Sequence, residues 1–116
     1  MRDDRDLVQD IVNRIDLTQE FVAGGRDTFM ENRMMQEAVI RNLEVIGEAS
    51  RSLTEELRQQ HPEVPWKQIG AFRNFVIHVY WDIKLERIWQ IVENDLPPLK
   101  PEIEAILQEL DAGQPQ

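Results

Sequence analysis

The chain of 116 residues contains no cysteine and only two histidines. Without cysteine it can form no disulfide bond, no thiolate metal site and no thiol nucleophile, and this composition fits a reducing cytosol. The charged residues at its N-terminus lead into no apolar core of signal-peptide length, and no other run is long enough to suggest a membrane span. We therefore expect a cytoplasmic protein that does not associate with a membrane.

Basic residues are also scarce: 13 Lys and Arg stand against 22 Asp and Glu, which gives a net charge of −9. Non-specific affinity for nucleic acid comes largely from the neutralisation of phosphates by Lys and Arg, so this chain does not coat nucleic acid broadly. A narrow cleft that contains Arg73, with Arg41 or Arg33 beside it, can still hold one phosphate. Any binding of nucleic acid is therefore expected to be weak and selective.

What the chain does contain is apolar residues at helical spacing. The first such stripe stops at Gly24 and Gly25, a typical helix end, and consists of Leu7, Ile11, Ile15, Thr18 and Val22. No segment shows the strict alternation of a half-buried strand. We predict an all-α fold, an up-and-down bundle of about four to five helices. It forms one domain over residues 1–116, with a frayed tail after about residue 112.

A second helix is predicted to begin at Thr28, where residues 28–31 have the form of a capping box, and to continue to Leu53. Its apolar stripe contains one polar member, Asn42, which either fixes the register of the helix or borders a cleft. A similar capping pattern begins at Ser52 and opens a short helix that Pro62 closes.

Prolines organise the rest of the chain. Pro65 suits the first position of a helix that should run to about His78. In the C-terminal third, apolar residues keep steps of three and four through Pro97 and Pro98: Leu85, Trp89, Val92, Leu96, Leu99, Ile103, Ile106 and Leu110. The apolar residues keep the same helical spacing before and after the two prolines. We therefore predict a kinked or interrupted helix that resumes against the same partner.

Residues 73–80 bring together the groups that attack on a phosphodiester requires. Arg73 carries a planar, permanently charged fork that matches a phosphate, and His78 can exchange a proton near neutral pH. Residues five apart on an ideal helix differ by about 140° around its axis, so these two side chains do not share a face. Either the helix ends or distorts near His78, or the site combines two chains.

Proton transfer favours a site that two chains share. Attack by a ribose 2′-hydroxyl needs a base for that hydroxyl and an acid for the departing oxygen. The only other histidine, His61, lies at a predicted helix end, where a cationic side chain is favourable for structural reasons. A two-fold dimer would bring two copies of His78 to one cleft. No spacing of Asp and Glu with His specifies a metal site.

The order Arg73, Asn74, His78, Tyr80 resembles the R-N-x-x-x-H-x-Y motif of ribonuclease toxins of the HEPN superfamily, specifically the HepT-like group. Residues 41–49 resemble the second-helix signature of that group, and residues 61–66 resemble the segment that leads into its motif helix. The likeness runs from about residue 39 to residue 107. It departs from the pattern at Val79, where we expect a glycine, and at Trp81, where we expect a smaller or different aromatic residue.

The resemblance implies a metal-independent endoribonuclease, the toxin of a type VII-like toxin–antitoxin pair, which cleaves RNA at a homodimer cleft without a cofactor. In this hypothesis Arg73 stabilises the charged transition state, His78 transfers protons and Asn74 orients one of the two side chains. Glu48 also supports the site: it either pairs with Arg73 or is solvated, and we favour the pair. The resemblance further implies that Tyr80 accepts adenylyl groups from a partner antitoxin, a minimal nucleotidyltransferase, which silences the toxin.

A rival interpretation is a binding module without catalysis. In this alternative the chain is a helical, nucleotide-binding partner of a minimal nucleotidyltransferase, and the motif is retained for phosphate contact only. The acidic net charge and Val79 favour the binding module, whereas the intact pair of Arg73 and His78 favours the enzyme.

Overall fold

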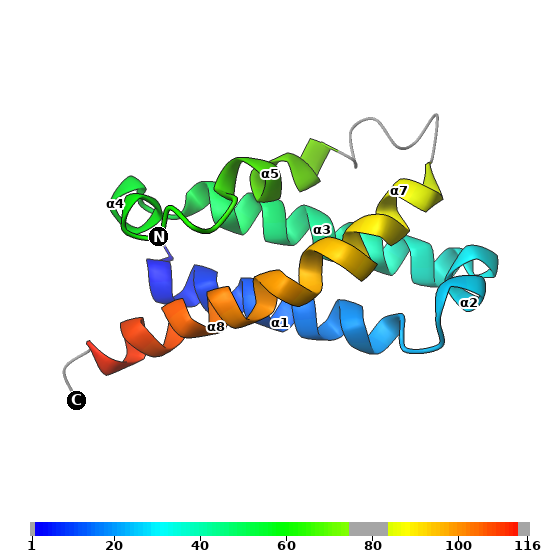
Figure 1. Ribbon diagram of the computed structural model, residues 1–116, viewed down its shortest axis with the longest axis horizontal. Helices are drawn as coiled ribbons and strands as arrows, with labels where there is room; N and C mark the ends of the chain where they lie inside the picture. The colour runs from blue at the N-terminus through cyan, green and yellow to red at the C-terminus, as the bar shows by residue number, and fades with distance from the viewer. Residues whose placement is uncertain (1, 75–83, 114–116) are drawn as a thin grey trace.

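The computed structural model describes residues 2–74 and 84–113, and every regular element in these ranges is a helix, which confirms the predicted all-α class. The α-helices are α1 (Asp4–Phe21), α2 (Arg26–Glu31), α3 (Arg33–Ser52), α4 (Glu55–Gln60), α5 (Trp66–Gly70), α7 (Leu85–Gln90) and α8 (Leu96–Ala112). A 3-10 turn, η1 (Ala71–Arg73), follows α5 directly, and a π-helical turn, η2 (Ile91–Asp95), joins α7 to α8 (Figure 1).

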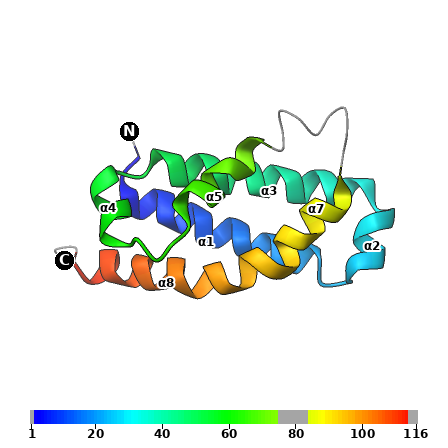
Figure 2. The same cartoon turned by 45° about the horizontal axis from the view of Figure 1, so that its top comes forward.

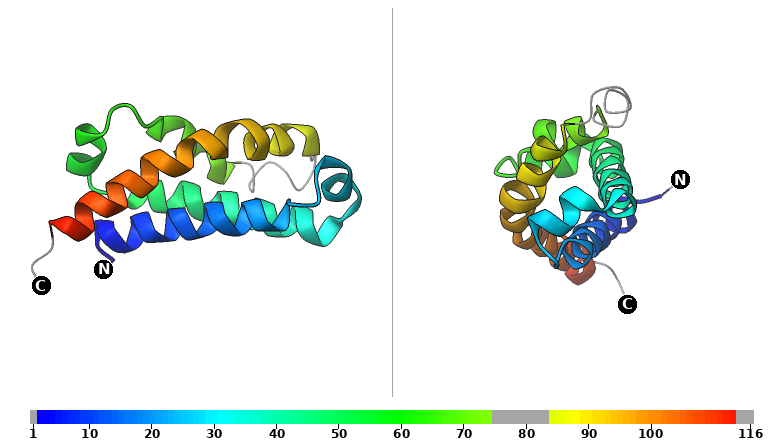
Figure 3. Two further views of the ribbon diagram at one scale, coloured as in Figure 1. Left: turned by 60° about the horizontal axis from the view of Figure 1, so that its bottom comes forward. Right: turned by 90° about the vertical axis from the view of Figure 1, so that its right-hand side faces the viewer.

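The long helices form an up-and-down bundle, as predicted. α3 runs antiparallel to α1, α5 returns along α3, and the continuous segment of α7, η2 and α8 runs back along the bundle (Figures 1 and 2). α1 packs against both α3 and α8, whereas α3 also contacts α5 and η1 on its other side. The end-on view of Figure 3 shows the helices arranged around one centre. Fully buried side chains from several helices meet there, among them Ile11, Ile15, Ile46, Leu96 and Ile103.

α1 forms as its sequence predicts. Asp3 is its N-cap, and the side chain of this residue accepts a hydrogen bond from the backbone N–H of Asp6. The apolar stripe from Leu7 to Thr18 is buried, and the helix ends just before the two glycines. Gly25 has φ of 95°, a conformation that side chains disfavour, so glycine is required for the turn into α2.

The predicted helix from Thr28 to Leu53 is wrong at its beginning, because the structure divides it into α2 and α3 at Asn32. The hydroxyl of Thr28 donates to the carbonyl oxygen of Gly24 and does not cap a helix. Asn32 is extended, with φ of −115° and ψ of 101°, and its side chain accepts from the N–H of Met35 to cap α3. The N-cap of the long helix α3 is therefore Asn32, four residues after the predicted cap at Thr28.

α4 ends before Pro62 as predicted, but its cap is Thr54, not Ser52. The hydroxyl of Thr54 accepts from the N–H of Leu57 and also donates to the carboxylate of Asp4 at 2.6 Å. The same carboxylate accepts the backbone N–H of Thr54 at 3.0 Å. The start of α1 and the start of α4 are therefore held together.

The interrupted C-terminal helix is confirmed, and its interruption is a π-helical turn. In η2 the N–H of Leu96 donates to the carbonyl of Ile91, five residues earlier. Pro97 and Pro98 follow Leu96 directly, in the first turn of α8. Neither has a backbone N–H, so neither can donate a hydrogen bond back to the preceding turn. The buried residues on both sides stay in phase against the same core.

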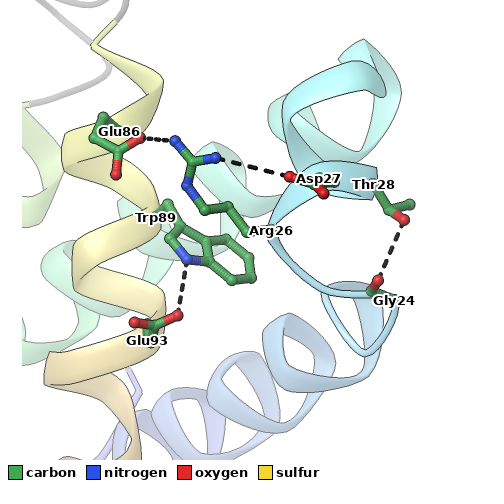
Figure 4. A network of polar contacts seen from close by, with 7 residues as sticks. All are labelled: Gly24, Arg26, Asp27, Thr28, Glu86, Trp89 and Glu93. Carbon is green, nitrogen blue, oxygen red and sulfur yellow. Dashed lines mark hydrogen bonds and ion pairs between the residues drawn. The ribbon is translucent and has the colours of Figure 1, made fainter.

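Polar and aromatic contacts join α2 to α7 (Figure 4). The guanidinium of Arg26 forms an ion pair with Glu86 and lies 3.8 Å from a carboxylate oxygen of Asp27. The rings of Phe29 and Trp89 lie 5.4 Å apart between centroids, and Phe29 is fully buried. These contacts hold the beginning of α7 against the rest of the bundle.

In the part of the chain that the structure describes, no helix combines the length and apolarity needed to cross a membrane.

The buried ring of Phe29 gives a first prediction. Phe29→Ala should lower the free energy of unfolding by about 3–5 kcal/mol, because it removes a fully buried side chain and the contact with Trp89. Denaturant unfolding followed by circular dichroism measures this loss. The matched control is Phe21→Ala, since Phe21 is 37% exposed and its loss should cost much less. Equal costs for the two variants would contradict the described packing of α2 on α7.

Candidate active site

Arg73 lies where α5 and η1 cross α3 at close range. Gly47, in the middle of α3, is buried and faces the backbone of this crossing. A β-carbon at position 47 would lie 2.8 Å from the backbone nitrogen of Arg73 and 3.2 Å from the carbonyl oxygen of Ile69. A carbon atom cannot be accommodated that close to backbone atoms, so glycine is what allows α3 and η1 to approach each other.

The backbone tightens from an α-helix to a 3-10 turn just before the end of the first described range. The helix predicted from Pro65 to about His78 is not unbroken: Pro65 is the N-cap of α5, and the α-helix gives way to the 3-10 turn after Gly70 before Asn74 is α-helical again. The predicted end near His78 lies outside the described residues. In the 3-10 turn Phe72 is 2% exposed, which anchors the turn in the core. Arg73 is half-buried and Asn74 is exposed, so both remain accessible at the surface.

His78 and Tyr80, the other two motif residues, lie outside the described residues, as do all positions from 75 to 83. The distance from Arg73 to His78 and the choice between one chain and two therefore stay predictions.

Two polar residues of α3, Glu48 and Asn42, were candidates for a role at the site. Glu48 is exposed, and no ion pair joins it to Arg73, so the favoured pairing of these two residues does not form. Asn42 is buried, and its Oδ1 accepts a hydrogen bond from the guanidinium of Arg14 on α1 at 3.0 Å. Of the two roles left open for Asn42, this contact supports the fixing of register between α1 and α3.

Arg33 and Arg41 do not supply the local positive charge that the sequence suggested. Arg33 pairs with Glu37, and Arg41 pairs with Glu44 at 2.9 Å. Other basic side chains are neutralised in the same way by carboxylates of the described residues. These further pairs are Arg2 with Asp10, Arg5 with Asp111, Arg26 with Glu86, and Lys100 with Asp16.

Three basic residues that form no ion pair with any other described residue line an open groove beside the motif, with a volume of about 650 Å³. We call it the basic groove; it is lined by Arg51, Glu55, Arg58, Gln59, Trp66, Lys67, Gly70, Ala71 and Asn74. The ion pairs recorded among the described residues include none of Arg51, Arg58 and Lys67. Since Asn74 lines the groove, the groove reaches the residue next to Arg73.

These three basic residues could not be identified as a group from the sequence. One signal was present, because Arg51 follows Gly47 by four residues and therefore lies on the same face of α3. Arg58 and Lys67 come from two further helices, and no spacing along the chain links them to Arg73.

His61, the second histidine, has a structural environment as expected. Its Nδ1 lies 3.3 Å from Glu63 and its Nε2 lies 3.2 Å from Glu109 on α8, while its carbonyl oxygen accepts the indole N–H of Trp66. These contacts join the segment before α5 to the C-terminal helix. Within residues 2–74 and 84–113, no three His, Cys, Asp or Glu side chains are placed to hold a metal ion.

Comparison with known proteins finds a match to one family. The family model described as "Ribonuclease HepT-like" matches residues 11–106, a range that includes α3, α5 and the whole motif. No solved structure matches the chain.

Several curated relatives resemble the chain over most of its length. It is 39% identical over 106 residues to "Putative RNase MJ1380" of Methanocaldococcus jannaschii, which covers 90% of this chain and 97% of that protein. It is 35% identical over 106 residues to "Probable ribonuclease HepT" of Thermococcus cleftensis, covering 90% and 96%. A third relative, "Gamma-glutamylcyclotransferase and putative RNase MJ0434" of M. jannaschii, is 37% identical over 102 residues and is longer. The chain spans only 46% of its length.

The crossing at Gly47 can be tested by adding one methyl group. Gly47→Ala should destabilise the protein by about 1–3 kcal/mol, because the new β-carbon must push the backbone of Arg73 away. It should also speed amide hydrogen exchange at residues 69–73. Gly113→Ala is the control, since a β-carbon there meets its nearest atom, the carbonyl oxygen of Glu109, at 3.4 Å. If both variants were as stable as the parent protein, the crossing would not be as close as described.

Proposed function

The chain belongs to the HepT-like ribonuclease family, and we propose that it is a metal-independent endoribonuclease toxin whose catalytic residues are Arg73 and His78. The observation that carries this proposal is the family match, which spans the motif. It is supported by the position of Arg73, which is half-buried on a turn that Gly47 and Phe72 hold against the core. A catalytic side chain benefits from such a rigid support, because small errors of position cost much of the rate.

The proposed reaction uses the RNA's own 2′-hydroxyl as the nucleophile. His78 removes the proton of this hydroxyl, and its oxygen attacks the adjacent phosphorus atom. The bond from phosphorus to the 5′-oxygen breaks, and a second proton donor protonates the departing oxygen. The products are a 2′,3′-cyclic phosphate and a 5′-hydroxyl. Arg73 stabilises the extra negative charge on the phosphate oxygens in the transition state, and Asn74 orients one of the reacting side chains by hydrogen bonding.

A homodimer is part of the proposal because the reaction requires both a base and an acid. His61 is held between two carboxylates on the side of α8, so the second copy of His78 is the better donor. Sedimentation should then give twice the chain mass of 13.7 kDa. Mixing Arg73→Ala chains with His78→Ala chains should restore activity if one site draws on both chains, and failure to do so in a proven mixed dimer would exclude a shared site.

Control of the toxin is proposed to act through Tyr80 and a partner protein. A minimal nucleotidyltransferase antitoxin would transfer adenylyl groups to the phenol oxygen of Tyr80, two residues after His78. The added phosphates would repel and crowd the substrate phosphate at Arg73 and His78.

The rival function, a nucleotide-binding partner without catalysis, is favoured by one observation. The net charge of −9 repels RNA at long range, whereas a small nucleotide feels this field less because it carries fewer charges. The rival predicts nucleotide binding without cleavage of any RNA by purified protein.

The catalytic mechanism predicts that RNA cleavage persists in EDTA and leaves 2′,3′-cyclic phosphate ends, which mass spectrometry of the products identifies. His78→Ala should abolish cleavage with little change in melting temperature. Arg73→Lys keeps the charge but loses the planar fork, so its kcat should fall by at least about tenfold, or about 1.4 kcal/mol. Strict dependence on Mg²⁺ or Mn²⁺ would contradict the mechanism, and parental turnover in Arg73→Lys would show that Arg73 is a solvated charge.

The regulatory proposal predicts that incubation with ATP and the cognate transferase adds adenylyl groups to Tyr80 and suppresses RNA cleavage. Tyr80→Phe deletes the acceptor oxygen and keeps the ring, so this variant should remain unmodified and active when the transferase is present. Peptide mass spectrometry locates the modification. Its appearance on another residue, or covalent silencing of Tyr80→Phe, would refute the role of Tyr80.

A further inference from the structure

The basic groove is built from three helices that are separate in the sequence. Arg51 lies at the end of α3, Arg58 on α4, and Lys67 on α5. α5 lies along the C-terminal half of α3, and α4 lies at the C-terminal end of α3 (Figures 1 and 2). Side chains from all three helices line the groove. The residues that line it all belong to the described part of the chain.

Charge distinguishes this groove from the rest of the surface. Its lining carries the three basic side chains and one acidic residue, Glu55, whose carboxylate accepts a hydrogen bond from Gln59. The local excess is positive in a protein whose net charge is −9. Elsewhere, basic residues are engaged with carboxylates, among them Arg2, Arg5, Arg26, Arg33, Arg41 and Lys100. Arg14, Lys84 and Arg87 also have no ion pair within the described residues, so what distinguishes the groove is that three such basic side chains line one surface.

Two of the basic side chains, Arg51 and Arg58, have close or buried surroundings at the groove. A β-carbon at Gly70 would lie 3.0 Å from Cγ of Arg51, so the stem of Arg51 passes over α5 at a glycine. The Nε–H of Arg58 is buried and has no hydrogen-bond partner among the described residues. A buried, unsatisfied donor on a cation is costly to stability.

The groove also offers an aromatic surface and leads to the motif. The indole N–H of Trp66 donates to the carbonyl oxygen of His61 at 2.9 Å, which fixes the ring as part of the lining. At the other side the lining includes Asn74, the residue after Arg73.

We propose that the basic groove binds the sugar-phosphate backbone of single-stranded RNA beside the phosphate that is cleaved at Arg73. Arg51, Arg58 and Lys67 contact the phosphates, and the ring of Trp66 stacks on a base. This inference rests on the proposed function for the identity of the ligand. An acidic protein surface would also match the charge, but the aromatic lining and the continuity with Asn74 favour a nucleic-acid strand.

RNA binding and RNA cleavage are measured separately, so that the proposal about the groove and the proposal about the reaction can each be refuted without the other. The probe is a labelled single-stranded RNA with 2′-O-methyl groups, which cannot be cleaved, and fluorescence anisotropy gives its Kd. The double variant Arg51→Gln, Arg58→Gln should weaken binding at least about tenfold and reduce the slope of log K against log salt by about 1.4, for two phosphate contacts. With cleavable RNA, KM should rise and kcat should change little.

The control Arg2→Gln, Lys100→Gln lowers the net charge by the same two units but alters residues that are paired outside the groove. Its Kd for RNA should lie within about twofold of the parent value, because these two charges are already paired with carboxylates and lie outside the groove. If the groove variant is unfolded by circular dichroism, Lys67→Glu replaces it, since Lys67 is exposed on α5.

The outcomes separate the two proposals. Groove-dependent binding of RNA by a protein that cleaves none would support the groove and refute the endoribonuclease. Cleavage with the same Kd, KM and salt slope in the groove variant and the control would refute the groove. Competition by poly-glutamate as strong as by RNA would also refute it, because the groove would then be a docking site for an acidic protein.

Discussion

The close backbone contact between α3 and η1 at Gly47 is the constraint on which the candidate site depends. Since the N–H of Arg73 lies against α3, the position of this arginine is set by a helix of 20 residues that packs along α1. Phe72 adds a second constraint by burying the neighbouring side chain. A residue on a free loop would lack both supports. Rigid backbone around a charged side chain is what pre-organised stabilisation of a transition state requires.

The distribution of charge reconciles an acidic chain with an anionic substrate. A net charge of −9 keeps RNA away on average, because the field of the whole surface acts at long range. Within a Debye length of about 8 Å, however, a ligand in the basic groove is influenced mainly by Arg51, Arg58 and Lys67. Carboxylates neutralise many of the remaining basic side chains. The expected result is weak, local binding that depends on the groove.

The ends of helices were predictable from the sequence where glycine or proline marks them. They were less predictable where two neighbouring residues could each serve as the N-cap. The turn at Gly24 and Gly25 and the interruption near Pro97 follow directly from backbone chemistry, and both were predicted. The break at Asn32 was missed, because Thr28 has the same capping chemistry in sequence and only its contacts in space show that it bonds to Gly24. The tightening of α5 into η1 was missed as well, since it accompanies the contact with α3.

By itself the sequence determined the helical class, the up-and-down order and the motif, because periodicity, capping and motif spacing are properties of neighbouring residues. Only the tertiary structure decided that Asn42 joins α1, that Glu48 and Arg73 do not pair, and which basic residues lie beside the motif. The physical reason is that a groove is made by separate helices that share a core. Arg51 and Lys67 line the same groove because α3 and α5 approach each other at Gly47, and no pattern along the chain records that distance.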